Sequence, residues 1–431
     1  MSAAWEYRQY DVVVWGATGY TGQICANYLA DTYGCASDKL SWAIAGRNEE
    51  KLAYVKDSLG SRFQGLDVLI GDGGDEETLD LITRRTKAVI TTAGPYSKYG
   101  NALVDSCVRN GTHYCDLTGE TGWVKSNIEK QHGNAQKTGA KIVHSCGFDS
   151  IPADLSTLML ANYLMENYDT KTQEMKYWCL ESFGGVSGGT LDSLWTILGD
   201  DSLSEAMGDP WVLQAKGSPR GVSSGKELGK AWPVEYDQDI KMWTAPSPFA
   251  PHDECIVRRS VSLMQDLFTS PDQFKYKETI GTRDGGIGAA FAAGVTLGLG
   301  AFATASYIPR SRNVLQNVLP KPGEGPSLET RKRGFFKNKY LAIGENGARA
   351  FGLVEGVQDP GYGETAKMLC ETGLCLALDW KQHRTQEGGV LTPAVAIGLP
   401  LITRLQNAGM TWEVLSQDRS TSQRDQKGVA L

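Results

Sequence analysis

The chain has 431 residues, of which 41% are hydrophobic and 22% charged, and its net charge is −7 at pH 7. This length suggests two domains at about 100–200 residues each, and the composition is that of a globular protein. The negative charge argues against a nucleic-acid partner. Nine scattered cysteines without a CxxC pair predict reduced thiols, with no disulfide framework and no metal site. Because the N-terminus lacks a secretory signal, we expect a cytoplasmic protein.

Short apolar runs alternate with segments of helical spacing over the first 150 residues. Such alternation is typical of βαβ units and a parallel sheet. Six runs fit the doubly wound, Rossmann-type dinucleotide fold. The predicted strands are 11–16, 40–45, 65–71, 87–92, 112–117 and 141–146, and the predicted helices are 20–31, 48–59, 75–85, 100–110 and 121–138.

The first strand runs directly into glycines in "DVVVWGATGYTGQ", residues 11–23. Gly16 permits a tight turn, Gly19 lets backbone approach a pyrophosphate, and Gly22 lets the next helix pack closely on the strand. The helix N-terminus supplies N–H donors to the phosphates. We therefore interpret this GxxGxxG spacing as a dinucleotide cradle, with a purely structural turn as the alternative. The predicted cofactor contacts are Gly16, Ala17, Thr18, Gly19, Tyr20, Thr21 and Gly22.

The end of the second strand, "AIAGRNEEKL", indicates which nicotinamide cofactor is used. NAD enzymes place an acidic residue there, whereas this chain has Gly46 followed by Arg47. A guanidinium suits a 2′-phosphate, so the sequence favours NADPH, with Asn48 and Lys51 assisting. The alternative is that Arg47 is a solvated residue at a helix start. Asp72 either touches the adenine or caps the next helix.

Candidate catalytic residues follow the fourth and fifth strands, at the sheet edge where ligands bind. The small or rigid residues Ala93, Gly94 and Pro95 are expected to contact the cofactor. Tyr96 either projects toward the nicotinamide or is a packed loop aromatic. Asp116 either orients the substrate or nicotinamide ribose, or caps the following helix.

Several motifs occur once each, in a characteristic order along the chain. The first group is "GATGYTG", "AGRNEEKL", "TTAGPYSKYG", "YCDLTGE" and "GFDSIPADL". The later group is "SGGTLDS", "PKPGEGPS", "DPGYGETAKML" and "GGVLTPAVAIG". Together they cover nearly the whole chain. The pattern resembles the saccharopine dehydrogenase-like oxidoreductases, a group that includes mycobacterial trans-acting enoyl reductases. The resemblance implies a Rossmann domain, a second α+β domain and a C-terminal helical return to the first.

The remaining segments suggest how the domains are divided. Pro152 places a helix start after Ser150, so Asp149 lies either near the cofactor edge or in a helix cap. We predict strands at 172–182, 256–264 and 273–280, long loops over 200–255, and a helix at 362–379. We expect an NADP-binding domain at 1–150, completed by 385–416. The substrate domain is expected at 151–384, and a polar disordered tail at 417–431.

Residues 285–309 carry no charge and include six glycines. Three interpretations stand in order of preference: a buried helix, an apolar patch that touches a membrane or lipid droplet, and a membrane span. Basic residues dominate the stretch that follows, which suits an anionic surface. Gly294 and Gly298 also permit close helix packing, and a homodimer is a further hypothesis.

These observations predict an NADPH-dependent oxidoreductase that delivers hydride to an enoyl C=C or an imine C=N. The apolar segment favours a small-molecule or carrier-linked apolar substrate, of lipid or polyketide type. One alternative is a saccharopine-type amino-acid imine reductase, although Arg258 and Arg259, adjacent on a predicted strand, form no obvious carboxylate-binding cluster. A second alternative is a catalytically silent NADP-binding protein on lipid droplets or membranes.

Overall fold

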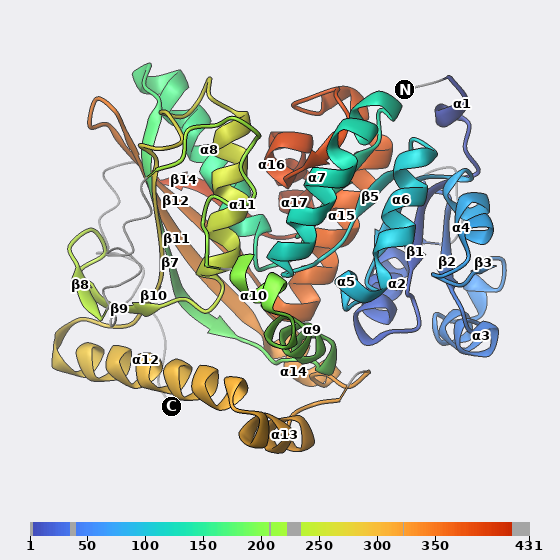
Figure 1. The fold of residues 1–431 in the computed structure, drawn as a ribbon, viewed down its shortest axis with the longest axis horizontal. Coiled ribbons are helices and arrows are strands. Elements are labelled where there is room, and N and C mark those ends of the chain that lie inside the picture. The colour runs from blue at the N-terminus through green and yellow to red at the C-terminus, as the bar shows by residue number, and fades with distance from the viewer. Residues whose placement is uncertain (1–2, 35–39, 207, 222–233, 322, 416–431) are drawn as a thin grey trace.

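Two seven-stranded sheets form the frame of the molecule (Figure 1). The computed structural model describes residues 3–34, 40–206, 208–221, 234–321 and 323–415, so the predicted tail at 417–431 lies outside the described residues. Helices cover both faces of the first sheet and fill the space between the two sheets (Figure 1). This is the predicted Rossmann-type α/β fold with a second α+β unit.

The first sheet is parallel throughout, in the order β13-β6-β5-β4-β1-β2-β3. The order reverses between β1 and β4, which confirms the doubly wound arrangement. All six predicted N-terminal strands are present, and β13 adds a seventh from near the C-terminus. The strands are β1 (Tyr10–Trp15), β2 (Trp42–Gly46), β3 (Asp67–Ile70), β4 (Thr86–Thr91), β5 (His113–Cys115), β6 (Lys141–Val143) and β13 (Gly389–Leu391).

Strand β1 shows why its apolar run is continuous rather than alternating. Val12 and Val14 pack into the core beneath α2 and α15, whereas Val13 and Trp15 pack beneath α4 and α6 on the opposite face. A parallel strand covered on both faces needs apolar residues at every position. The helices are α1 (Ala3–Glu6), α2 (Tyr20–Tyr33), α3 (Glu49–Ser58), η1 (Ser61–Phe63), α4 (Glu76–Thr83), α5 (Tyr96–Tyr99), α6 (Asn101–Arg109), α7 (Thr121–Thr138) and α15 (Thr365–Leu378).

The second sheet is mixed, in the order β14-β12-β11-β7-β10-β9-β8. Its strands are β7 (Thr172–Phe183), β8 (Glu235–Asp237), β9 (Met242–Pro246), β10 (Lys275–Gly281), β11 (Phe335–Gly344), β12 (Arg349–Gly356) and β14 (Thr411–Leu415). The accompanying helices are α8 (Ile151–Tyr168), α9 (Gly188–Gly199), α10 (Asp201–Ala206), α11 (Ala250–Leu263), α12 (Gly285–Tyr307), α13 (Pro309–Val318), α14 (Leu328–Arg333), η2 (Pro360–Glu364), η3 (Trp380–Gln382), α16 (Pro393–Ala396) and α17 (Leu399–Asn407).

The strand predicted at 256–264 is wrong, because residues 256–263 belong to helix α11 and Met264 is its C-cap. The β-branched residues there are buried between the sheets, where tertiary packing overrides their local preference. Both neighbouring arginines are also buried: Arg258 donates to the Phe274 carbonyl at 3.0 Å and Arg259 to the Leu213 carbonyl at 2.7 Å. The long loops predicted over 200–255 are interrupted by α10, β8 and β9.

The C-terminal part of the chain contributes to both sheets. Helix α15 packs on β1, β4 and β5, although its residues fall within the range 151–384 that we predicted for the substrate domain. Within 385–416, which we predicted to complete the first domain, β13 pairs with β6 whereas β14 pairs with β12 of the second sheet. The chain therefore passes between the units more often than the sequence suggested.

Helix α12 is exposed, so the favoured interpretation of 285–309 as a buried helix is wrong. Its buried residues are limited to Gly288, Ala292, Thr296 and Ser306. It is also long and apolar enough to cross a membrane by length and composition. A helix that is apolar on all sides yet exposed needs a physical explanation.

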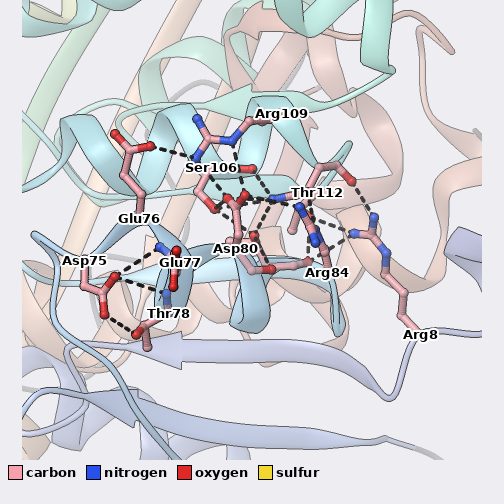
Figure 2. A network of polar contacts seen from close by, with 12 residues as sticks. Arg8, Asp75, Glu76, Glu77, Thr78, Asp80, Arg84, Ser106, Arg109 and Thr112 are labelled. Atoms are coloured by element: carbon pink, nitrogen blue, oxygen red, sulfur yellow. Dashed lines mark hydrogen bonds and ion pairs between the residues drawn. The ribbon is translucent and has the colours of Figure 1, made fainter.

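A polar network fastens the amino ends of the first sheet's strands (Figure 2). Arg8 donates to the Thr86 carbonyl at 2.8 Å and to Thr112 Oγ1 at 2.7 Å. Asp80 on α4 accepts from Ser106 Oγ at 2.6 Å and pairs with Arg109 at 2.9 Å, both on α6. These contacts tie α4 and α6 to the strands and leave the opposite, carboxyl edge of the sheet for the site.

Gly373 on α15 allows that helix to pack tightly on β4. A Cβ there would lie 2.4 Å from Ile90 Cγ1. We expect Gly373→Ala to destabilise the protein by about 1–3 kcal/mol through overpacking, measured by thermal and denaturant unfolding. The control is Gly133→Ala on α7, where a Cβ meets nothing within 4 Å and the helix gains up to about 1 kcal/mol. Equal stability of the Gly373 variant and the parent would contradict the packing described.

Candidate functional site at the carboxyl edge of the first sheet

The turn between β1 and α2 has the geometry of a phosphate cradle. Gly16 adopts φ 80°, a conformation that favours glycine. A Cβ on Gly22 would lie 2.2 Å from the Gly16 carbonyl oxygen, so only glycine fits there. Gly19 donates its N–H to that carbonyl at 3.0 Å and precedes α2 without a side-chain cap. The helix N-terminus therefore keeps uncapped N–H groups and a partial positive charge, which suit a pyrophosphate.

The other residues of the turn lie in different surroundings. Ala17 is fully buried, and the Thr18 carbonyl accepts from Gln23 Nε2 at 3.0 Å. Tyr20 faces the second unit, where its hydroxyl donates to the Pro326 carbonyl and its ring stands edge-on to Tyr362 with centroids 5.2 Å apart. Tyr20 thus joins the two units, a role that we did not predict.

The polar residues after β2 and β3 lie farther along the same sheet edge. Asn48 Oδ1 accepts the Lys51 N–H at 2.8 Å and caps α3. Arg47 and Lys51 have exposed side chains and form no ion pair within the described parts of the chain. Asp72 accepts the Gly74 N–H at 2.8 Å, while Asp75 caps α4. Arg47 is therefore available to a 2′-phosphate, and its contact with one stays a prediction.

A cavity of about 510 Å³ lies beyond the carboxyl ends of β4, β5 and β6 and reaches the end of β7. From the first unit and the start of α8 it is lined by Thr21, Thr92, Gly94, Tyr96, Leu117, Thr118, Gly119, Ser145, Gly147, Phe148 and Asp149. From the second unit and the start of α15 it is lined by Ser182, Gly184, Gly185, Val186, Ser187, Gly189, Thr190, Ser193, Leu194, Ile197, Phe249, Pro360, Gly361, Tyr362 and Thr365. Ala93 and Pro95, the neighbours of Gly94, are not among the described lining residues of the cavity.

Tyr96 borders the cavity and is also firmly packed. It is 3% exposed, and its ring stacks on Trp123 with centroids 5.6 Å apart. Its hydroxyl donates to the Thr91 carbonyl at 3.3 Å. Glu120 Oε1 accepts the Tyr96 N–H at 2.7 Å. Burial, followed by the charge of Asp116, raises the pKa of Tyr96 well above its ordinary value, which makes it a weak proton donor.

Asp116 is fully buried behind the cavity and is absent from its described lining. Its carboxylate accepts from Tyr114 OH at 2.9 Å, from His144 Nδ1 at 2.7 Å and from the backbone N–H of Ser145 at 3.1 Å. Ser145 does line the cavity and adopts φ 62°, an uncommon conformation for a non-glycine residue. The geometry thus suits Asp116 to holding Ser145 in place rather than to touching a substrate.

Asp149 is the carboxyl group that lines the cavity. The expected cap role is not observed, because Ser150 occupies the N-cap position of α8 and no side chain forms a capping hydrogen bond there. Burial raises the pKa of Asp149 to about 6. A carboxyl group with such a pKa can supply a proton near neutral pH.

The second unit contributes lining residues that sequence reasoning did not assign to the site. Tyr362 OH lies 2.9 Å from Thr190 Oγ1, and the Ser187 backbone N–H donates to Tyr362 OH. Phe148 and Phe249 pack edge-on at 6.2 Å. The motifs "SGGTLDS" and "DPGYGETAKML" contain several of these residues, so the sequence carried a sign of their importance. Only the tertiary structure shows that these two motifs lie at the carboxyl edge of the first sheet.

The cavity lining is poor in charge. Its titratable side chains are Asp149, Tyr96 and Tyr362, and none of the described lining residues is Lys, Arg or His. Leu117, Val186, Leu194 and Ile197 line it together with Phe148 and Phe249. The site therefore combines apolar side chains with many hydroxyls and a single acidic group.

Comparisons with known proteins agree with this geometry. Residues 12–143 match the family model described as the saccharopine dehydrogenase NADP binding domain. A putative trans-acting enoyl reductase from Mycobacterium tuberculosis is 34% identical over 94% of this chain and 97% of its own length. A trans-acting enoyl reductase from Mycobacterium leprae is 33% identical over the same shares. The fold is similar to saccharopine dehydrogenase (L-Glu forming) from Saccharomyces cerevisiae, with TM-score 0.50, 14% identity and coverage of 94% and 100% of the two chains.

The glycine turn at the topological switch point and the matching domain define an NADP-dependent oxidoreductase. The chain belongs to the saccharopine dehydrogenase-like oxidoreductase family. Its cofactor is NADPH, and the turn from Gly16 to Gly22 has the form that such a cofactor's phosphates require.

Replacing Arg47 tests how the phosphorylated cofactor is selected. Because charge-assisted hydrogen bonds contribute about 1.5–3 kcal/mol, Arg47→Ala is expected to weaken NADPH binding by about 10- to 100-fold. NADH binding is expected to change little, and calorimetry measures both. Arg62→Ala is the control, since this exposed guanidinium pairs with Asp31 in the same unit. An unchanged ratio of the two affinities would assign the 2′-phosphate to other residues.

Proposed function

We propose that this protein uses NADPH to reduce the C=C bond of an apolar enoyl substrate of lipid or polyketide type, free or carrier-linked. The observation that carries the proposal is the cavity lining, which holds apolar side chains and hydroxyls but no cationic group among its described residues. Bound NADPH supplies the hydride. The protein contributes positioning, exclusion of water and a proton.

The lining counts against a saccharopine-type substrate. Such a substrate carries several carboxylates, which proteins bind with fixed cations. Arg258 and Arg259, the adjacent pair in α11, are buried and donate to main-chain carbonyls instead. The relatives named as enoyl reductases support a C=C bond as the reduced group, with an imine C=N as the second candidate.

Hydride addition to an enoyl carbon leaves negative charge that a proton must neutralise at the adjacent carbon. Asp149 lines the cavity, and burial raises its pKa to about 6. Its carboxyl group is therefore protonated in a fraction of the molecules at neutral pH. Tyr96 is the weaker candidate because its hydroxyl is engaged with Thr91 and its pKa is raised well above the ordinary value. Asp149 is therefore assigned as the proton donor.

A substrate panel tests the proposal directly. Loss of NADPH absorbance is followed with medium- and long-chain enoyl thioesters, with simple imines, and with 2-aminoadipate semialdehyde plus glutamate. We expect turnover of the enoyl thioesters, rising with chain length as more of the apolar lining is covered. Preferential turnover of the semialdehyde with glutamate would support the saccharopine-type alternative and overturn the proposal.

Asp149 gives the reaction a predicted pH dependence. The neutral carboxyl is present below pH about 6 and is lost as the pH rises through that value, so kcat is expected to fall above it. Asp149→Asn is expected to lower kcat by about 100- to 10,000-fold and to remove this inflection. Tyr96→Phe keeps the stacked ring, and we expect it to retain activity within about tenfold. A reversed ranking of the two variants would identify Tyr96 as the donor.

A further inference from the structure

Helix α12 exposes large apolar side chains along most of its length. Ile287 is 78% exposed, Phe291 62%, Leu297 60% and Tyr307 60%. The exposure continues into α13, where Val318 is 79% exposed. A contiguous apolar surface of this kind marks an interaction site rather than ordinary scatter of single residues.

Three hydroxyls of α12 and of the turn that follows it donate to carbonyls of α12, whereas Ser306 Oγ is buried without a described partner. Thr296 Oγ1 donates to the Ala292 carbonyl and Thr304 Oγ1 to the Gly300 carbonyl, each at 2.8 Å. At the C-terminal end, Ser311 Oγ donates to the Ala305 carbonyl at 2.8 Å. These hydroxyls do not depend on water for partners, so the helix can enter an apolar medium at low cost.

Basic residues gather beside this apolar surface. Arg310 follows α12, Lys321 follows α13, and Lys332 and Arg333 end α14, all with exposed side chains. The acidic residues of the same stretch, 310–333, are Glu324 and Glu329. This stretch is positive although the whole chain carries −7, so its charge is complementary to an anionic surface. A two-fold symmetric dimer through this face would place the same positive stretches against each other.

The placement of α12 suits insertion parallel to a surface. The helix runs along one side of the molecule, past the edge of the second sheet, and continues into α13 (Figure 1). Asp284, an exposed residue, caps its start, and the charged α13 follows its end. An amphipathic or apolar helix that lies in the interface plane, with basic residues beside it, is the arrangement of monotopic membrane binding.

The same placement brings the membrane side close to the cavity. Helix α9 lies between α12 and the cavity: Trp195 on α9 packs on Phe302 of α12 with centroids 6.5 Å apart. Ser193, Leu194 and Ile197, on the same helix, line the cavity. An occupant of the α12 surface is therefore separated from the site by a single helix.

We propose that α12 and α13 dock this protein on a bilayer containing anionic phospholipid, with α12 lying in the plane of the membrane surface. The docking places the α9 wall of the cavity next to the acyl layer. It stands independently of which double bond is reduced, because its test is binding rather than turnover.

The test is sedimentation of the purified full-length chain with vesicles of phosphatidylcholine alone or with added phosphatidylserine. We expect binding to the anionic vesicles that weakens as salt is raised. Phe291→Asp with Leu297→Asp, and separately Lys332→Glu with Arg333→Glu, are each expected to lower the partition coefficient by about tenfold or more. NADPH affinity and thermal unfolding, which both variants should preserve, show that they fold.

Matched variants on other surfaces serve as controls. Tyr54→Asp with Leu81→Asp alters exposed apolar residues of α3 and α4, and Lys130→Glu with Lys137→Glu alters exposed lysines of α7. Both pairs are expected to bind vesicles like the parent protein. Failure of the parent to sediment with anionic vesicles overturns the proposal. So does a lipid-free dimer, seen by light scattering, that the Phe291 and Leu297 changes dissociate, because a second copy then covers α12.

Discussion

The contact between the turn after β1 and the first turn of α2 constrains everything else in this structure. The Gly16 carbonyl oxygen occupies the space where a side chain on Gly22 would begin. Helix α2 can therefore approach the sheet closely and direct its uncapped N-terminus along the strand ends. That approach creates the phosphate cradle, and it also places Tyr20 against the loop at Pro326 and against Tyr362 of the second unit.

The buried carboxylate of Glu120 organises part of the cavity wall. Glu120 accepts the backbone N–H groups of Tyr96 and Ser97 and also the Ser193 hydroxyl, which belongs to α9. One acid thus holds the loop after β4 and a helix of the second unit in a common position. A carboxylate that accepts several hydrogen bonds is held rigidly. A rigid cavity wall helps to position a substrate whose own groups offer few polar contacts.

The first domain could be predicted well because its signals are local. Continuous apolar strands, helical spacing and the glycine turn each occupy one short segment, and 87–92 was placed within one residue of β4. The strand predicted at 256–264 failed because Val257 and Val261 are β-branched yet buried in a helix between two sheets. The composition of α12 does not distinguish a buried from an exposed apolar helix.

The site was predicted only in part for a related reason. The cradle is a single segment, whereas the cavity combines residues as far apart in the chain as Thr21, Ser193 and Tyr362. For Asp149 the sequence leaves open a place near the cofactor edge or in a helix cap, because its position in the cavity lining depends on how α8 starts. Which residues line the cavity is decided by tertiary contacts between distant segments rather than by the residue types themselves.

The contribution of β13 to the first sheet affects how the chain is made. During synthesis the nucleotide-binding unit emerges early, but its edge strand, Gly389–Leu391, leaves the ribosome some 250 residues after its neighbour β6. Until then the edge of β6 is unpaired and exposed, and the face over β4 stays uncovered until α15, Thr365–Leu378, emerges shortly before β13. The nascent protein therefore passes through a long interval with an incomplete sheet. During that interval the unpaired strand edge and the uncovered apolar face are surfaces that a molecular chaperone binds.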